Sequence, residues 1–262
     1  MKRRKFITHI ALGSLAMSIG CRPGNKNKAK ITHIISLSFD DGFRKSFTRT
    51  AEIYEKHNLS ACFNVMAAGH FPGFDRPENY MPGNKLGDFG LWNEFLKRGH
   101  EVMPHGWAHE NLMEMPIEEA KALITKSIDY FSEHLDGFDP SKAVFNFPFN
   151  ASTPELNEWT VTRVRAVRTI VRALPNNPFP DKDLRILDCT SHGPDNIDKQ
   201  LDMLIDGFLK SEGGWFIFNT HGLDDEGWGP MSSGYLDELL ARLKNIPFIE
   251  MLPVGRALEK YT

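Results

Sequence analysis

The sequence predicts an α/β protein built as a closed or nearly closed barrel of about seven or eight parallel strands. Three observations lead to this fold class. Strand-like apolar runs alternate with amphipathic helix-like stretches, which is typical of parallel sheets covered by helices. About eight strands within about 230 residues suit a barrel better than an open sheet. The polar motifs that could carry chemistry directly follow strands, where α/β folds place their sites.

The elements follow from hydrophobic periodicity and from start and stop signals. Strand-like runs cover residues 34–39, 61–66, 101–104, 143–147, 165–170, 184–188, 215–219 and 247–251. Helix-like stretches cover residues 45–57, 89–98, 117–134, 153–162, 196–211, 233–244 and 254–260. Pro116 with Glu118 and Glu119 suits a helix start, as does Asp195. The segment Ala67–Leu86 is too long for a simple connector, so we expect a lid or rim loop.

The first 21 residues predict an export signal outside the fold. A basic start, Lys2–Lys5, precedes a modestly apolar stretch, Phe6–Ile19, that is short for a membrane span. Ser18–Cys21 resembles a bacterial lipobox, and Arg3–Ile7 resembles a twin-arginine signal. An ordinary signal peptide with an incidental cysteine is the alternative.

We therefore expect a lipoprotein of the bacterial cell envelope, anchored at Cys21 by acyl chains. Residues 22–30, rich in Lys, Asn and Gly, read as a polar tether, and residues 31–262 as the catalytic domain. A secreted or periplasmic protein is the alternative location.

Charge and cysteine content narrow the class further. The chain has 31 Lys and Arg residues against 34 Asp and Glu, and four of the basic residues lie in Lys2–Lys5. This mild acidity, without a basic stripe, argues against nucleic-acid binding. Cys62 and Cys189 lie in or beside apolar strand patterns, where free cysteine packs as a small hydrophobe. A disulfide between them stays open for an exported protein.

Two short motifs about sixty residues apart carry the clearest chemistry. Ser38–Gly42 closes an apolar run with two adjacent carboxylates, of which one can bind a metal while the other accepts a proton from water. His105 and His109 follow another strand-like run and share a face if that turn is helical. One carboxylate and two imidazoles on one face leave open positions, as a catalytic divalent-metal site requires.

With both motifs in this order, the chain resembles the polysaccharide deacetylase family (carbohydrate esterase family 4, the NodB-like homology domain). The resemblance implies a deformed (β/α) barrel that removes N- or O-acetyl groups from sugars with one divalent metal ion. By this match Asp40 is the expected general base. Asp41, His105 and His109 are the expected ligands of the metal, zinc in the first place, with cobalt or nickel as alternatives.

The later motifs of the family match in part. Gly214–His221 resembles the last one, a buried strand that delivers a histidine, so His221 is the expected general acid. Asn146 stands where the family has an arginine beside the base, and we expect Arg168, on the next strand, to approach Asp40 instead. The family's motif of an Asp near a Trp is not clear here, and Asp188 is the candidate to orient His221.

The residues around these motifs have simpler interpretations. Trp107 is expected to pack beneath the site. For Trp228 two interpretations stand equally: it stacks on a sugar, or it packs in the core. Asp224, Asp225 and Glu226 are most simply a solvated loop, although their place beside His221 leaves a role at the rim open.

The expected reaction is hydrolysis of an acetyl group on a glycan or oligosaccharide. Asp40 would take a proton from water that the metal activates, and His221 would protonate the leaving amine or alcohol. Two alternatives remain: a hydrolase of small cyclic amides on the same fold, and a surface sugar-binding lipoprotein without turnover.

Overall fold

The protein is described here from a computed structural model, over residues 29–74, 86–170 and 176–262. The predicted export signal, the lipobox cysteine, most of the tether and residues 75–85 of the predicted rim loop lie outside these ranges. Within them, no helix is both long enough and apolar enough to cross a membrane.

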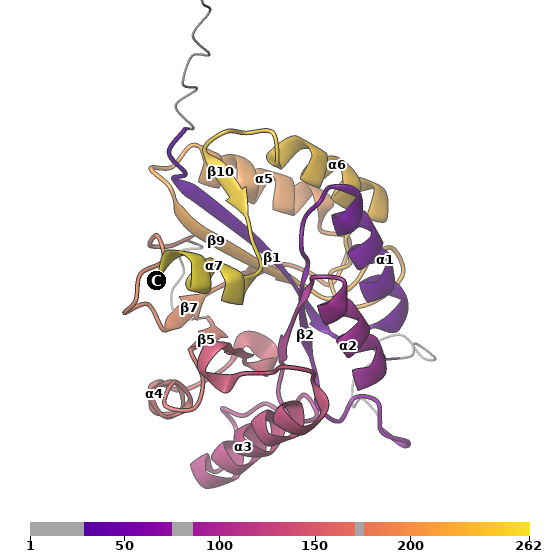
Figure 1. The fold of residues 1–262 in the computed structure, drawn as a ribbon, viewed down its shortest axis with the longest axis vertical. Coiled ribbons are helices and arrows are strands. Elements are labelled where there is room, and N and C mark those ends of the chain that lie inside the picture. Colours follow the sequence, from indigo (N-terminus) through magenta and orange to yellow (C-terminus); the bar gives the residue numbers. More distant parts are fainter. Residues whose placement is uncertain (1–28, 75–85, 171–175) are drawn as a thin grey trace, which may run out of the picture.

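Ten strands form two sheets in the described residues (Figure 1). The larger sheet has the order β3-β2-β1-β9-β6, with β10 beside β1 and β8 beside β9. It contains β1 (His33–Asp41), β2 (Cys62–Val65), β3 (Glu101–Pro104), β6 (Asn176–Asn177), β8 (Thr190–Ser191), β9 (Gly214–Thr220) and β10 (Ile249–Met251). The smaller sheet has the order β4-β5-β7, with β4 (Val144–Asn146), β5 (Ala166–Thr169) and β7 (Ile186–Asp188). Every pair is parallel except β6 with β9.

Side-chain hydrogen bonds join the two sheets at places where no described backbone ladder does. Asn146 of β4 donates from Nδ2 to the carbonyl of Pro104 in β3, at 3.3 Å. At the other junction, Asn177 of β6 donates to the carbonyl of Asp188 in β7 and accepts from its N–H, both at 2.8 Å. The predicted α/β barrel class is confirmed, but its strands lie in two linked sheets and the short β6 is antiparallel.

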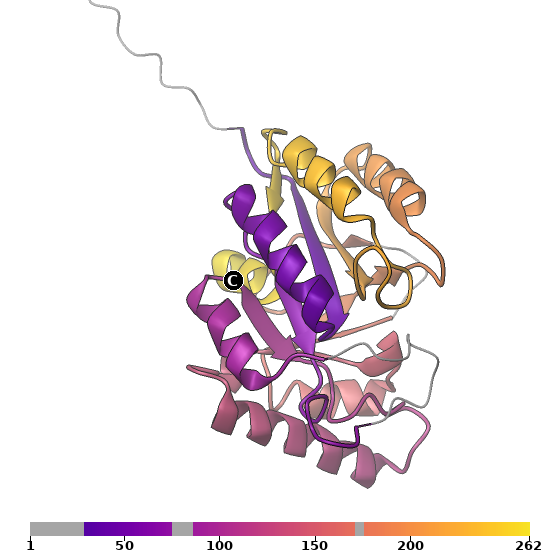
Figure 2. The ribbon, with the colours of Figure 1, turned by 90° about the vertical axis from the view of Figure 1, so that its right-hand side faces the viewer.

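The helices surround the strands on the outside of the barrel (Figures 1 and 2). They are α1 (Arg44–Lys56), α2 (Phe89–Lys97), α3 (Ile117–His134), α4 (Pro154–Thr160), α5 (Asp198–Leu209), α6 (Ser233–Leu243) and α7 (Val254–Tyr261), with short 3-10 turns η1 (Pro140–Lys142) and η2 (Pro148–Asn150). Each α-helix overlaps a predicted stretch within a few residues, because apolar positions at helical spacing pack against the barrel. Pro116 directly precedes α3, as predicted. Asp195 does not cap α5, where Asn196 accepts from the N–H of Asp198 instead.

The interior of the barrel changes from apolar to polar along the strands. Residues that point inward alternate with residues that face the helices, as the pleat of a strand requires. The apolar inward layer contains Ile34, Cys62, Val144, Ala166, Leu187, Cys189, Trp215 and Ile217. Later inward positions on the same strands are polar and buried: Ser38, Asp40, Asn64, Asn146, Arg168 and Asn219. Both Cys62 and Cys189 are free thiols, so the disulfide that the sequence left open is not formed.

Candidate active site

The three predicted metal ligands meet at the carboxyl ends of β1 and β3. The Nε2 atoms of His109 and His105 lie 3.3 and 3.5 Å from Oδ1 of Asp41. One ligand atom from each residue lies within 4.8 Å of the others. Two ligands at about 2.1 Å from a tetrahedral ion stand about 3.4 Å apart, so this donor set fits a metal such as zinc.

The turn that carries His105 and His109 is not helical, so the two imidazoles do not share a helix face. Residues 105–109 form a loop after β3, in which Gly106 has φ +78° and His109 has φ +64°. A Cβ atom on Gly106 would lie 2.9 Å from Cγ of Pro148, so both conformation and space require glycine there. Asp41 also has a positive φ, of 85°. Left-handed backbone at Asp41 and His109, which is rare for non-glycine residues, turns both side chains toward one point.

The tautomer of His105 follows from its hydrogen bond. Its Nδ1 lies 2.9 Å from the carbonyl oxygen of Asn146, which can only accept, so Nδ1 carries the proton. The lone pair of Nε2 then faces the carboxylate of Asp41. This buried Nε2 has no hydrogen-bond partner in the described part of the chain. A ligand histidine held through its other nitrogen is typical of metal sites.

Arg168 contacts Asp40, as predicted from the sequence. Its Nη1 donates to Oδ1 of Asp40 at 2.9 Å, and its Nη2 donates to Oδ2 at 2.6 Å. Both side chains are almost completely buried, and Nη1 also donates to Ser38 Oγ. Arg168 of β5 is the register partner of Asn146 in β4, which explains how a guanidinium from either strand could reach the same carboxylate.

A set of buried asparagines around Asp40 was not predicted from the sequence. Asn64 donates to Oδ1 of Asp40 at 2.7 Å, and Asn219 donates to Oδ2 at 3.4 Å. Asn146 in turn donates to the side-chain oxygen of Asn64 at 2.9 Å. The signal available in the sequence was strand alternation, since these residues occupy inward positions near the ends of β2, β4 and β9.

The electrostatics of Asp40 favour its ionised form. Burial by itself would raise the pKa of this carboxyl, but the attraction of Arg168, followed by that of His105, outweighs it and lowers the pKa below its ordinary value. Conversely, Asp40 keeps the buried Arg168 charged against the effect of burial, so the pKa of Arg168 is raised. The pair therefore remains a carboxylate and a guanidinium at neutral pH.

His221 follows the end of β9 and is buried, with its ring held by the main chain. Its Nδ1 lies 2.7 Å from the carbonyl oxygen of Trp228, so Nδ1 is the protonated nitrogen and Nε2 is available to exchange a proton. Asp188 was expected to orient this ring, and the contact that the structure shows at Nδ1 is the carbonyl of Trp228. Asp188 ends β7, where its backbone pairs with Asn177.

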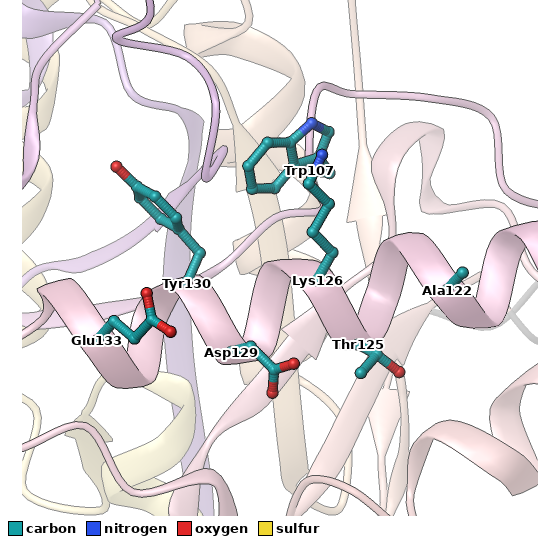
Figure 3. Close-up of a pocket in the computed structure, with 7 residues that line it drawn as sticks. All are labelled: Trp107, Ala122, Thr125, Lys126, Asp129, Tyr130 and Glu133. Carbon is teal, nitrogen blue, oxygen red and sulfur yellow. The ribbon is translucent and has the colours of Figure 1, made fainter.

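Trp107 is partly buried and packs against the hydrophobic core. Its indole lines an open hollow of about 480 Å³ on the outer face of α3, together with Ala122, Thr125, Lys126, Asp129, Tyr130 and Glu133 (Figure 3). The ammonium of Lys126 lies 3.7 Å from the centre of a Trp107 ring. The side chain of Trp107 therefore connects the 105–109 loop to α3.

The fold and this cluster together define an α/β-barrel protein with a candidate metal site at the carboxyl ends of its strands. The sequence profile of the polysaccharide deacetylase family matches residues 27–161, just over half of the chain. The chain belongs to this family. No curated protein matches the sequence.

Solved structures share the fold at low sequence identity. A protein from Mycobacterium smegmatis that is described as a polysaccharide deacetylase has a TM-score of 0.65 at 13% identity, covering 89% of this chain and 93% of its own. A family 4 acetyl xylan esterase from Clostridium thermocellum, in complex with a cobalt ion, has a TM-score of 0.56 at 17% identity. A peptidoglycan deacetylase from Bacillus subtilis has a TM-score of 0.52 at 17% identity. Each of the last two covers 87% of this chain and 91% of its own.

Proposed function

We propose that this protein is a metal-dependent hydrolase that removes acetyl groups from a glycan. One observation carries the proposal: in a member of the polysaccharide deacetylase family, the cluster of Asp41, His105 and His109 lies directly beside a second carboxylate, Asp40, that Arg168 holds ionised. A ligand set and a separate proton acceptor at adjacent positions are the parts that hydrolysis by activated water needs.

In this mechanism the chain's own residues divide the proton transfers. A divalent ion held by Asp41, His105 and His109 would polarise an acetyl carbonyl and lower the pKa of water. Asp40 accepts the proton of the attacking water, and Arg168 orients its carboxylate with two parallel hydrogen bonds. The barrel fixes both Asp40 and Arg168 because they lie near the ends of β1 and β5.

His221 is the proposed general acid. Its Nδ1–H is held by the carbonyl of Trp228, which leaves Nε2 to carry the proton that the leaving amine or alcohol receives. The imidazole is also near enough to Asp40 to contribute to the lowering of the pKa of that carboxyl. Acid and base therefore belong to one site.

Acetate release tests the proposed function. Peptidoglycan and acetyl xylan, the substrates named for the two relatives above, are the first polymers to assay, with N-acetylglucosamine oligomers beside them. We expect release by the wild-type protein, its loss after chelation, and its return on adding Zn²⁺ or Co²⁺. His105→Ala should contain less metal than wild type by elemental analysis, because it removes one of three ligands.

Two results would contradict this proposal. Metal content equal to wild type in both His105→Ala and His109→Ala would remove the metal assignment. Stoichiometric metal without acetate release from any acetylated glycan would favour the sugar-binding alternative.

We further propose that the mature protein begins at Cys21 and is held on the bacterial envelope by acyl chains, with residues 22–30 as tether. The support is the order of a basic start, a short apolar stretch and a small residue before cysteine. Fractionation of cells should place the wild type with membranes and Cys21→Ser in the soluble fraction. If the wild type and Cys21→Ser were equally soluble, the proposed lipid anchor would be wrong and only the proposed export would remain.

A further inference from the structure

We infer that Glu226 is a positioning residue for His221, because its buried carboxylate fastens the loop of residues 221–231 to the first turn of α1. The inference rests on the proposed role of His221 and adds a residue outside the family motifs. The sequence suggested a solvated loop for Asp224–Glu226, whereas the side chain of Glu226 is almost completely buried.

The carboxylate of Glu226 binds the start of a helix that is 180 residues away in sequence. Its Oε2 accepts from the N–H of Ser46 at 2.8 Å and from the hydroxyl of Ser46 at 2.6 Å. Phe43 precedes α1, and its side chain carries no hydrogen-bond acceptor that could cap the helix. The N–H groups of the first turn therefore need another acceptor. A carboxylate also suits the positive end of the helix dipole.

A second bond fastens the same loop to the same residue. The N–H of Leu223 donates to the hydroxyl oxygen of Ser46 at 2.9 Å. The hydroxyl of Ser46 therefore donates to Glu226 and accepts from Leu223, which joins two points of the loop to one turn of α1. This turn begins two residues after Gly42, so the loop of His221 is tied to the segment that presents Asp40 and Asp41.

The loop is too tightly closed for Glu226 to move independently of the carbonyl that holds His221. The N–H of Glu226 donates to the carbonyl of Leu223 at 3.1 Å, and that of Met231 donates to Gly222 at 3.1 Å. A Cβ atom on Gly222 would lie 2.2 Å from the carbonyl oxygen of Glu226. Trp228, whose carbonyl accepts from His221, is only two residues beyond Glu226.

The far side of the loop is held by packing. A Cβ atom on Gly193 would lie 2.7 Å from the indole of Trp228, and the N–H of Gly229 donates to the carbonyl of Pro194 at 2.8 Å. The carbonyl of Trp228 is thus fixed between a packed indole on one side and the Glu226–Ser46 contact on the other. Release of the second contact should let this carbonyl shift and the ring of His221 turn.

The neighbouring residue Asp225 provides a matched control. It carries the same charge, lies in the same loop and contacts the same helix, through an ion pair with Lys45 at 2.6 Å. Both of these side chains are mostly exposed, and an exposed ion pair restrains a loop little. A change seen in Glu226→Ala and absent in Asp225→Ala would therefore reflect the buried attachment and not loop charge.

Kinetics on the metal-loaded full chain give the first test, with an N-acetylglucosamine pentamer and acetyl xylan as probes. We expect Glu226→Ala to lower kcat about 10- to 100-fold, since a misplacement near 1 Å can cost about a hundredfold, with KM and metal content unchanged. Glu226→Gln should keep most of the rate, because its amide oxygen can accept both bonds from Ser46. Ser46→Ala should also lower kcat, and Asp225→Ala should have the kcat of wild type.

Nuclear magnetic resonance of ¹⁵N-histidine protein gives a second readout that needs no turnover. His221→Gln identifies the signal, which in wild type should show Nδ1–H as the protonated tautomer. Glu226→Ala should give mixed tautomers for His221, while Glu226→Gln and Asp225→Ala keep the wild-type signal. Melting curves confirm that each variant is folded.

The outcomes separate this inference from the proposed function. Wild-type kcat with an unchanged His221 signal in Glu226→Ala would overturn it. Equal losses in Glu226→Gln and Glu226→Ala would also overturn it, since charge rather than attachment would then matter. If wild type releases no acetate but the His221 signal responds as expected, the proposed deacetylation fails and the positioning of His221 stands.

Discussion

Replacing Arg168 by methionine should lower the free energy of unfolding by about 3–5 kcal/mol, because it leaves the carboxylate of Asp40 buried without its counter-charge. Asp40→Asn should lower the free energy of unfolding by a similar amount, because it leaves the guanidinium of Arg168 buried without a counter-charge. The double variant Asp40→Asn/Arg168→Met should recover most of the loss, because a neutral amide and a thioether are tolerated where single charges are not. Urea unfolding of the four proteins measures this cycle.

If the losses of the two single variants simply add in the double variant, the two charges do not depend on each other.

The pH dependence of the free energy of unfolding tests the direction of the Asp40 contribution. The folded protein holds the pKa of Asp40 below its unfolded value, so this contribution to stability is present above about pH 4 and is lost as pH falls through the folded pKa. The stability advantage of wild type over the double variant should therefore shrink below about pH 4.

Turnover should respond to Asp40 more strongly than to any residue that leaves the metal ligands in place. The double variant Asp40→Asn/Arg168→Met should fold and bind metal, yet release acetate about 10²–10⁴-fold more slowly, because an amide cannot accept the proton. It is a better test than Asp40→Asn alone, which carries the stability defect as well. Acetate release per bound metal, measured at matched folded fraction, gives the comparison.

A second double variant serves as its control. Arg168→Met/Asn146→Arg keeps Asp40 and returns a guanidinium from the register-paired position on β4. It should retain measurable turnover where Asp40→Asn/Arg168→Met has almost none. Near-normal rates in the protein without Asp40 would remove this carboxylate from the mechanism.

Local sequence patterns predicted most of the elements in the fold. The helices α1 to α7 and the longer strands lie where apolar periodicity placed them, because each buries one face against the barrel. The two-residue strands β6 and β8 were missed, since a pair of residues is too short for a periodic signal. The spacing of His105 and His109 would give a shared face only in a helical turn, and a loop bent at Gly106 brings the two imidazoles together without one.

The sequence also predicted one part of the candidate site and missed another. Adjacent carboxylates after one strand and spaced histidines after another predicted the ligand cluster, because parallel strands bring their carboxyl ends to one edge. Arg168 could be placed near Asp40 because the family resemblance implies an arginine beside the base, Asn146 stands at that position, and Arg168 ends the following strand.

The partners of His221 could not be found in this way. A main-chain carbonyl from Trp228 carries no side-chain signature, and the contact of Glu226 with Ser46 joins residues 180 positions apart. The sequence by itself determined which residues lie at or just after strand ends, because this depends on local periodicity. Only the tertiary structure decided which of them meet and what holds His221, because those contacts depend on how distant segments close around one core.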